Sequence, residues 1–490
     1  MAGDTGRPPA NAPRCPVRGG ASPHGHAVGG PAAAPLAPGA LPLIGHLGAL
    51  AAGPLAFFEG LRAAGPVVRI KLAGRECHVV NSASLVHHML VAGHGDYDRG
   101  GPVMESLHAV FGDGLPASPD AIHRVERPLL QPLFRRERMP GYTARFLTEA
   151  TQQCASWANG QVLDVNTEMT RLSTGSLTRA LFRDPVSARV VRQFQEDLPV
   201  VLRGVAVRAA LPSVARLPLP ANRRFARSVR RTYVAIDEMV DHRGNDADAY
   251  DDLLTVLLAP RPDGAVGQAR EGAKEDRSAL ISGHIWGFMI AGIETTASLM
   301  TWMLQILVSH PEHYARVQEE VDEVLSAGTP DLEDLQRLGQ LDRVLNEVLR
   351  MYAPTWLSTR ITRRPTVLGG YTLPGGADVL FSMWALHRDP DVFPHPHRFD
   401  PDRWLDKNTP RTPHQGFLPF GAGTRKCIGD VFAVAEAKAA LAVLLHHCRF
   451  ETARGTKAVP RISLTQRAAR VRMTVTPRRP SAPKRRDKEC

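Results

Sequence analysis

The feature that most constrains this chain is the apolar segment Ser278–Ser309, in which Glu294 is the only formally charged residue. A segment of this length and composition is compatible with a membrane-spanning helix. Polar and glycine residues, however, recur along its whole length, at Ser282, Gly283, His284, Gly287, Gly292, Thr295, Thr296, Ser298, Thr301 and Gln305. At a rise of about 1.5 Å per residue, such a helix would cross an entire globular domain. We therefore expect a buried central helix and no membrane span.

Patterns on either side of this segment predict a mainly helical α+β domain with small sheets. Apolar residues that alternate with polar ones predict paired strands near the N-terminus, and helical periodicity prevails through the middle of the chain. Gly- and Pro-rich or polar stretches separate these elements. The predicted elements are strands at Val67–Leu72, Cys77–Val80 and Asp378–Phe381, helices within residues 121–309 and at Cys427–His447, and a polar loop near Arg261–Asp276.

Composition divides the 490 residues into three parts. Residues 1–40 are rich in Pro, Gly and Ala and are expected to form a flexible leader, residues 41–477 a single domain, and residues 478–490 a basic, disordered tail. The leader lacks the charged and then apolar pattern of a signal peptide. The six cysteines are scattered and include no CxxC pair, which is typical of a reducing compartment. We therefore expect a cytoplasmic protein, and a monomer.

The formal charge of +11 resembles that of a nucleic-acid-binding protein. Part of the excess lies in the tail, where Lys484, Arg485, Arg486 and Lys488 cluster. The chain has neither a zinc-finger spacing nor an alternation of aromatic and basic residues. We therefore expect no nucleic acid as a partner.

The most informative ten residues are Phe420–Gly429, which read Phe-Gly-Ala-Gly-Thr-Arg-Lys-Cys-Ile-Gly. The first two glycines permit a tight turn whose backbone can approach a flat ligand. Cys427 is expected to open the helix that follows, where free amides and the helix dipole stabilise a thiolate. Arg425 adds a cation suited to a carboxylate, and Gly429 lets the helix pack against a ligand without an intervening side chain.

This decade resembles the heme-binding loop of cytochromes P450, Phe-x-x-Gly-x-Arg-x-Cys-x-Gly, with no departure. The resemblance covers about residues 41–477 and implies the cytochrome P450 fold, with the long helix lying over a heme b (iron protoporphyrin IX). It implies that Cys427 binds the iron as a thiolate, with Phe420, Arg425 and Gly429 also at the heme. Three shorter runs further resemble bacterial enzymes that oxidise cyclic sesquiterpenes, namely Pro54–Phe58, Val68–Leu72 and Leu217–Phe225.

Two other basic positions belong to the same resemblance. His123 and Arg127 are four residues apart, so they share one face of a helix that follows the turn at Pro116–Asp120. By the resemblance they hold a heme propionate, and Arg360 matches another position that contacts a propionate. A solvated basic helix is the alternative for His123 and Arg127.

Glu347 and Arg350 stand three residues apart on a helix that ends before Pro354, so the two side chains can pair. In the family such a pair is buried and is joined by a second arginine from a proline-rich loop. In this chain Arg403 is a better candidate for that arginine than Arg398. The resemblance implies that this triad locks the fold and takes no part in catalysis.

Two adjacent threonines interrupt the central helix at Thr295 and Thr296. Their hydroxyls can bond back to helical carbonyls and bend the helix, and Gly292 nearby would then leave a notch for a small molecule. The resemblance implies that Thr295 hydrogen-bonds dioxygen and that Glu294 relays protons to it. An apolar substrate pocket is expected between the helix, a loop at Gly101–Phe111 and the stretch Thr355–Leu357. Its expected lining residues are Phe288, Ala291, Gly292, Trp356 and Leu357.

The resemblance therefore implies a monooxygenase that inserts one oxygen atom of O2 into a C–H bond of a small apolar substrate. A terpene, specifically a sesquiterpene of secondary metabolism, is the expected substrate. No flavin- or iron–sulfur-binding spacing is present, so a separate ferredoxin and ferredoxin reductase are expected to supply electrons, with Lys426 attracting an acidic ferredoxin.

Three alternatives remain open. One is a heme-thiolate protein that works without external electrons, as an isomerase, a peroxygenase or a sensor. Another is oxidation of a different apolar scaffold, such as a fatty acid, steroid or polyketide. The third is a basic protein that interacts with nucleic acid and carries the cysteine motif by accident.

Overall fold

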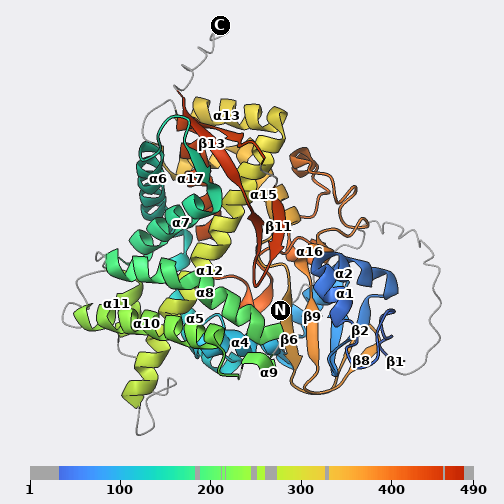
Figure 1. The fold of residues 1–490 in the computed structure, drawn as a ribbon. Helices are drawn as coiled ribbons and strands as arrows, with labels where there is room; N and C mark the ends of the chain where they lie inside the picture. The colour runs from blue at the N-terminus through green and yellow to red at the C-terminus, as the bar shows by residue number, and fades with distance from the viewer. Residues whose placement is uncertain are drawn as a thin grey trace, which may run out of the picture.

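The computed structural model describes residues 32–182, 188–210, 212–215, 217–243, 251–259, 273–325, 330–455 and 458–478. Helices form most of this structure and pack around the long helix α12, as Figure 1 shows. The helices are α1 Leu47–Ala52, α2 Pro54–Gly60, α3 Ala83–Leu90, α4 Pro102–Phe111, α5 Asp120–Leu130, α6 Met139–Ala155, α7 Val165–Leu181, α8 Ala188–Ala210, α9 Pro212–Ala215, α10 Pro220–Arg243, α11 Leu253–Leu258, α12 Ala273–Ser309, α13 Pro311–Leu325, α14 Leu332–Gln336, α15 Gly339–Tyr352, α16 Met383–Leu386 and α17 Asp430–His447.

Small sheets complete the described structure. The strands are β1 Ala32–Ala33, β2 Val67–Leu72, β3 Arg75–Val80, β4 Tyr97–Asp98, β5 Val162–Asp164, β6 Ser358–Thr362, β7 Thr366–Leu368, β8 Tyr371–Leu373, β9 Asp378–Phe381, β10 Cys448–Thr452, β11 Val459–Ile462, β12 Gln466–Ala469 and β13 Arg472–Pro477. One sheet has five strands in the order β2-β3-β9-β6-β4. The predicted hairpin is confirmed: β2 and β3 are antiparallel and joined at Ala73 and Gly74, which have φ values of +49° and +84°.

The central helix is confirmed and is longer than predicted. It begins at Ala273, so the last four residues of the predicted polar loop are helical, and it ends at Ser309. The end follows from the sequence, because Pro311 disfavours a helical conformation of the residue before it. Every residue from Ile281 to Ile290 is buried against neighbouring helices. No helix in the described part of the chain is long and apolar enough to span a bilayer.

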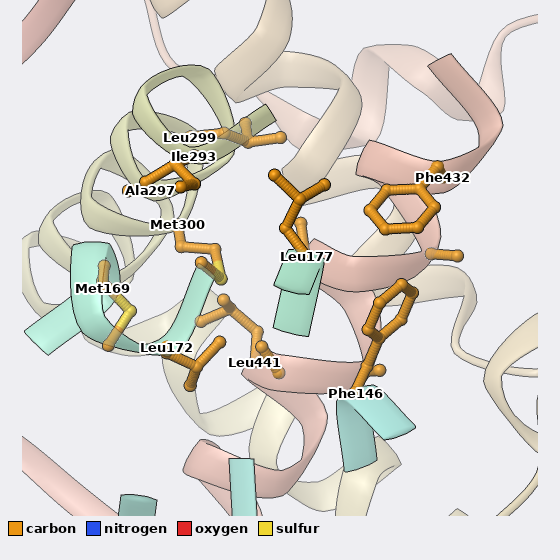
Figure 2. Close-up of a cluster of buried hydrophobic side chains, with 14 of the residues drawn as sticks. Phe146, Met169, Leu172, Leu177, Ile293, Ala297, Leu299, Met300, Phe432 and Leu441 are labelled. Carbon is orange, nitrogen blue, oxygen red and sulfur yellow. The ribbon is translucent and has the colours of Figure 1, made fainter. Parts of the chain in front are cut away.

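The core beside α12 is formed by side chains from α6, α7, α12 and α17, shown in Figure 2. The rings of Phe146 on α6 and Phe432 on α17 meet edge to face with centroids 4.9 Å apart. Burial of each large apolar side chain contributes about 1.5–3 kcal/mol to folding. This packing fixes α17, the helix that follows the cysteine loop, against α12. The labelled members are Phe146, Met169, Leu172, Leu177, Ile293, Ala297, Leu299, Met300, Phe432 and Leu441.

The predicted domain boundaries are corrected at both ends. Strand β1 pairs with β8, and Ala34 and Ala37 are buried in the core, so the folded part begins before residue 41. Arg478, predicted to open a disordered tail, donates from Nη2 to Asp322 Oδ2 at 2.7 Å. The rest of the predicted leader and tail lies outside the described residues.

The triad predicted to lock the fold comes together around the carboxylate of Glu347. Arg350 donates from Nε to Oε2 and from Nη2 to Oε1, both at 2.9 Å, and the Nε of Arg403 donates to Oε1 at 3.0 Å. Trp404 Nε1 adds a fourth side-chain donor at 3.1 Å. Arg398 contributes only its carbonyl, which accepts from Arg350. The network ties α15 to the loop around residue 400 in the interior, where an unpaired charge would be costly.

Candidate active site

The cysteine loop is a turn whose path is set by Gly423. Gly423 has φ +69°, and a Cβ built there would lie 1.8 Å from the carbonyl oxygen of Leu90 at the end of α3. Only glycine permits this close approach. The loop is closed by a hydrogen bond of 2.9 Å from the N–H of Cys427 to the carbonyl of Phe420. The sequence predicted that Cys427 opens the helix, and this is wrong. Helix α17 begins at Asp430, so Cys427 precedes it by three residues.

The thiol of Cys427 is accessible to solvent. Burial is nevertheless the largest effect on its pKa and raises it, while a hydrogen bond from the N–H of Gly429 acts in the opposite direction. Burial thus works against the thiolate, and a metal cation bound at the sulfur would favour it.

Cationic side chains gather on one side of the loop. Arg425 donates to the carbonyl of Ser118 at 2.9 Å, and Arg127 donates to the carbonyl of Lys426 at 2.6 Å. Burial together with the charges of Arg425 and Arg99 lowers the pKa of His123 to about 3, so this imidazole is neutral. Burial and the charge of Arg425 lower the pKa of Arg360 to about 10. The structure thus brings together the four basic residues that the sequence predicted for the propionates.

Arg99 joins this group and was missed from the sequence. It lies just after strand β4, and burial with the charges of Arg360 and Arg425 lowers its pKa to about 9. Its Nε is buried without a hydrogen-bond partner among the described residues. A lone arginine in a Gly-rich turn carries no periodic signal, so only its position in space reveals it.

These residues fit a heme. Arg425 already lies 3.5 Å from Asp98 and 3.6 Å from Asp120. The Nε of Arg99 has no hydrogen-bond partner among the described residues, and the charges of Arg360 and Arg425 repel this guanidinium, so the carboxylates of a heme would suit this cluster. Cys427 would hold the iron, and Phe420 and Gly429 would lie beside the porphyrin ring. The neutral His123 and the cation of Arg127 would hold the propionates together with Arg99, Arg360 and Arg425.

Helix α12 has one accessible face, on the residues that the resemblance places at the site. Within residues 281–304, which the structure describes completely, only Ala291, Gly292 and Thr295 are not buried. Ala291 and Thr295 are one helical turn apart and share a face. The hydroxyl of Thr295 donates to the carbonyl of Ala291 at 2.5 Å, so the predicted bond back to the helix is present. The helix nevertheless remains α-helical through this point.

The predicted notch at Gly292 is wrong. A Cβ built on Gly292 would lie 2.9 Å from both methyl groups of Leu177, so the glycine permits close packing of α12 on α7. It does not open space for a ligand on that side. Figure 2 shows Leu177 facing α12.

Two other predicted pocket residues belong to the core. Phe288 stacks on Phe134 with ring centroids 5.4 Å apart. Trp356 packs edge-on against Phe58 and donates from Nε1 to the carbonyl of Ser463 at 3.1 Å. Both rings are therefore held by apolar neighbours, while Leu357 stays half-buried. The predicted pocket loop at Gly101–Phe111 is instead the helix α4.

Glu294 is buried and already has partners. Its Oε1 accepts a hydrogen bond from Thr465 Oγ1 at 3.0 Å and lies 3.5 Å from Arg467 Nη1. Both partners lie at the β11–β12 hairpin, which contacts α12. The carboxylate is thus next to Thr295 in sequence but is directed to the hairpin.

A second buried contact joins α12 to α5. The backbone N–H of Leu115 donates to Nδ1 of His284 at 3.1 Å, and Nε2 of His284 lies 3.1 Å from Glu126 Oε2. Because an N–H can only donate, Nδ1 is unprotonated and Nε2 carries the proton that it donates to Glu126. The contact holds the central helix against the helix that carries His123 and Arg127.

This combination of a cysteine loop, a cationic cluster and an accessible helix face defines a heme-thiolate site. The family model described as Cytochrome P450 matches residues 35–474. The chain belongs to this family: it is a cytochrome P450 monooxygenase with heme as its cofactor.

The chain is similar to several curated enzymes of Streptomyces. It is 39% identical over 446 residues to cyclooctatin synthase of Streptomyces melanosporofaciens, covering 90% of this chain and 95% of that one. It is 34% identical to pentalenene oxygenase of Streptomyces avermitilis, covering 84% and 90%. The crystal structure of the cytochrome P450DA heme domain superposes with a TM-score of 0.79 at 26% identity, covering 92% of this chain and 99% of that one.

Proposed function

We propose that this enzyme inserts one oxygen atom of O2 into a C–H bond of a cyclic terpene. The observation that supports the substrate class is similarity to relatives whose names point to terpenes. These include pentalenene oxygenase and cyclooctat-9-en-7-ol 5-monooxygenase of Streptomyces melanosporofaciens, the latter 35% identical over 423 residues. Both sesquiterpenes and diterpenes are therefore candidates, which widens the expectation from the sequence.

The residues around the site suit such a substrate. Ala291 offers a methyl group at the accessible face of α12, and Leu357 adds partly exposed apolar surface. A pocket of this kind binds hydrocarbons through burial of apolar area, with few polar groups to orient them. When bound, the heme supplies the oxygen-activating redox chemistry.

The protein's own part is to deliver protons and to hold the cofactor. Thr295 is the one hydroxyl-bearing side chain that is not buried within residues 281–304, so we assign to it the final hydrogen bond to the oxygen substrate. Its hydroxyl can donate there after leaving the Ala291 carbonyl. Glu294 is the adjacent acid, and rotation away from Thr465 would free it to resupply the proton.

We further propose that electrons come from a separate acidic ferredoxin and its reductase. Lys426 is exposed beside Cys427, but its Nζ forms an ion pair with Asp430, which reduces its attraction for a partner. Arg135 and Arg136 are exposed next to Phe134, whose ring approaches Gly429. These cations and Lys426 would form the docking surface, since opposite charge accelerates association.

The function is tested with the holoenzyme and a surrogate ferredoxin and reductase. A panel of cyclic C15 and C20 terpenes, a fatty acid and a steroid is screened for a spectral shift of the heme and for oxygenated products. Electron-dependent oxidation of a terpene is expected. Products of the fatty acid or steroid alone, or turnover without electron consumption, would contradict the proposal.

The docking surface is tested by the rate of heme reduction as ionic strength changes. Lys426→Gln is expected to slow reduction a few-fold and to weaken its salt dependence. Lys407→Gln serves as the control, because Lys407 is also exposed. Equal rates in the two variants would remove Lys426 from the docking surface.

A further inference from the structure

A cationic surface lies on α8 and α10, away from the cysteine loop in sequence. Residues 198–236 contain eight arginines, Arg203, Arg208, Arg216, Arg223, Arg224, Arg227, Arg230 and Arg231, and no Asp or Glu. Arg216 lies outside the described residues. Helices α8, α9 and α10 lie together along one edge of the molecule, as Figure 1 shows. A charge excess this concentrated creates a strong local potential.

Two of these arginines have structural roles. Arg231 forms an ion pair with the buried Asp197 of α8. The guanidinium of Arg208 lies 3.6 Å from the centroid of the Phe225 ring, where α8 and α10 touch. These contacts hold the two helices together and leave the other arginines to be explained.

The remaining arginines of α10 form an exposed stripe. Arg223, Arg224, Arg227 and Arg230 follow the helical repeat, so they share one face of the helix. Within the described part of the chain, none of the four has an ion pair with an acidic side chain. The opposite face of α10 is buried, with Phe225, Ser228, Thr232, Ala235 and Ile236 turned inward. Packing of α10 therefore does not account for the stripe.

Large apolar side chains lie at the N-terminal end of the stripe. Leu217 and Leu219, directly before α10, are 50% and 40% exposed, and Val207 near the end of α8 is 37% exposed. Exposed apolar residues next to cations are typical of surfaces that enter the boundary between lipid headgroups and acyl chains. Nucleic acid would use the cations but would gain nothing from the leucines.

We propose that the α8–α10 surface, defined by Val207, Leu217, Leu219 and the stripe Arg223, Arg224, Arg227 and Arg230, docks the enzyme on anionic lipid membranes. The guanidinium groups would bind the phosphates of the headgroups, for which the fork of arginine is suited. The leucines would enter the outer edge of the acyl layer. This attachment is peripheral and needs no spanning helix.

The consequence for catalysis rests on the proposed function. An apolar terpene partitions into membranes, so an enzyme held at their surface meets a higher substrate concentration. Helix α10 also contacts α12, and the Tyr233 hydroxyl donates to the carbonyl of Val110 on α4 at 2.8 Å. The α8–α10 surface thus belongs to the part of the fold that covers the central helix.

The test is co-sedimentation of the full-length holoenzyme with vesicles. One set is phosphatidylcholine alone, and the other is phosphatidylcholine with an equal part of phosphatidylglycerol. Binding is expected only to the second set and should weaken as salt rises. The variant R223Q/R224Q/R227Q/R230Q should lose roughly several hundredfold in partition coefficient, since each cation near an anionic surface contributes about fivefold.

The matched control removes four charges from the tail, as K484Q/R485Q/R486Q/K488Q. It should keep most of the binding, and both variants should keep the heme spectrum of the parent enzyme. A second variant, L217S/L219S, should still bind at low salt but release at a lower salt concentration. Loss of binding in the tail variant with full binding in the stripe variant would overturn the proposal. So would binding of a DNA duplex as tight as that of the anionic vesicles.

Because vesicle binding is measured without substrate, its failure leaves the proposed oxidation of terpenes unaffected. Conversely, an enzyme that binds vesicles and oxidises only another substrate would contradict the proposed function alone.

Discussion

The carboxylate of Glu294 on the central helix accepts a hydrogen bond of 3.0 Å from the hydroxyl of Thr465 at the β11–β12 hairpin. The acid expected to supply protons is therefore held by a second element of the fold. Glu294→Gln keeps an oxygen that can accept from Thr465 but has no acidic proton. We expect its turnover number to fall about 100-fold with little change in KM. Thr465→Val, which releases the carboxylate, should not lower turnover to the same extent, and equal losses would indicate a structural role for Glu294.

The accessible hydroxyl of Thr295 leads to a second prediction. Thr295→Ala should bind substrate normally but divert electrons to hydrogen peroxide, because the hydroxyl that we propose as the donor to the oxygen substrate is gone. Product formed per electron consumed and peroxide released are the measurements. Thr301→Ala is the control, since Thr301 makes a similar bond to the carbonyl of Ala297 at 2.8 Å but is buried. Full coupling in Thr295→Ala would remove this residue from proton delivery.

Arg99 should affect the apoprotein and the holoprotein in opposite directions. Without heme, its charge is repelled by Arg360 and Arg425, so Arg99→Gln should raise the unfolding temperature of the apoprotein. With heme, loss of a charge-assisted hydrogen bond of about 1.5–3 kcal/mol should weaken heme retention some 10- to 100-fold. Heme transfer to apomyoglobin and thermal unfolding measure the two effects. A change of the same sign in both would show that Arg99 does not meet a propionate.

Glu436 should make stability depend on pH. This acid on α17 is fully buried, and burial raises its pKa to about 8 although the nearby Ser173 hydroxyl lowers it slightly. Neither carboxylate oxygen has a partner of hydrogen-bond geometry among the described residues. Because folding raises the pKa of Glu436, the protonated acid stabilises the folded protein. This contribution is fully present below the pKa of Glu436 in the unfolded chain, and it is lost as pH rises through about 8. The protonated acid is therefore the stable form.

Glu436→Gln should remove this dependence. Its unfolding free energy relative to the parent should increase as pH rises from about 4.5 and level off above about 8, by at most about 5 kcal/mol. Denaturant unfolding across this range measures it. A constant difference between the two proteins would show that Glu436 does not titrate there.

The network around Glu347 predicts a large loss of stability. Glu347→Ala leaves the guanidinium of Arg350 buried without its carboxylate, which costs about 3–5 kcal/mol. Arg398→Ala is the matched control and should change stability by less than about 0.5 kcal/mol, because that side chain takes no part in the network. Similar losses in both variants would mean that the surrounding loop, not the buried charge, determines stability.

Local sequence patterns predicted much of this structure. The central helix and the hairpin of β2 and β3 follow from periodicity and turn residues. The pairing of Arg403 with Glu347 follows from the resemblance to the family. The cysteine loop was recognisable because several side chains stand at fixed offsets in ten residues.

The errors arose where distant parts of the chain meet. Phe288 and Trp356 were assigned to the pocket, but aromatic residues suit a core equally well, and only their neighbours Phe134 and Phe58 decide. Gly292 was assigned to a notch that Leu177 of α7 fills. Arg99 could not be found, because its partners Arg360 and Arg425 follow more than 250 residues later. Long-range contacts of this kind leave no local signal.

The bridge from Leu115 through His284 to Glu126 limits how the molecule can open. One imidazole ring accepts from one segment and donates to another, so sliding α12 along α5 would break two buried hydrogen bonds at once. We therefore expect α12 and α5, the helix that carries His123 and Arg127, to move together. We also expect the motions that admit a substrate to come from the other helices around α12, with this pair as the frame against which they move.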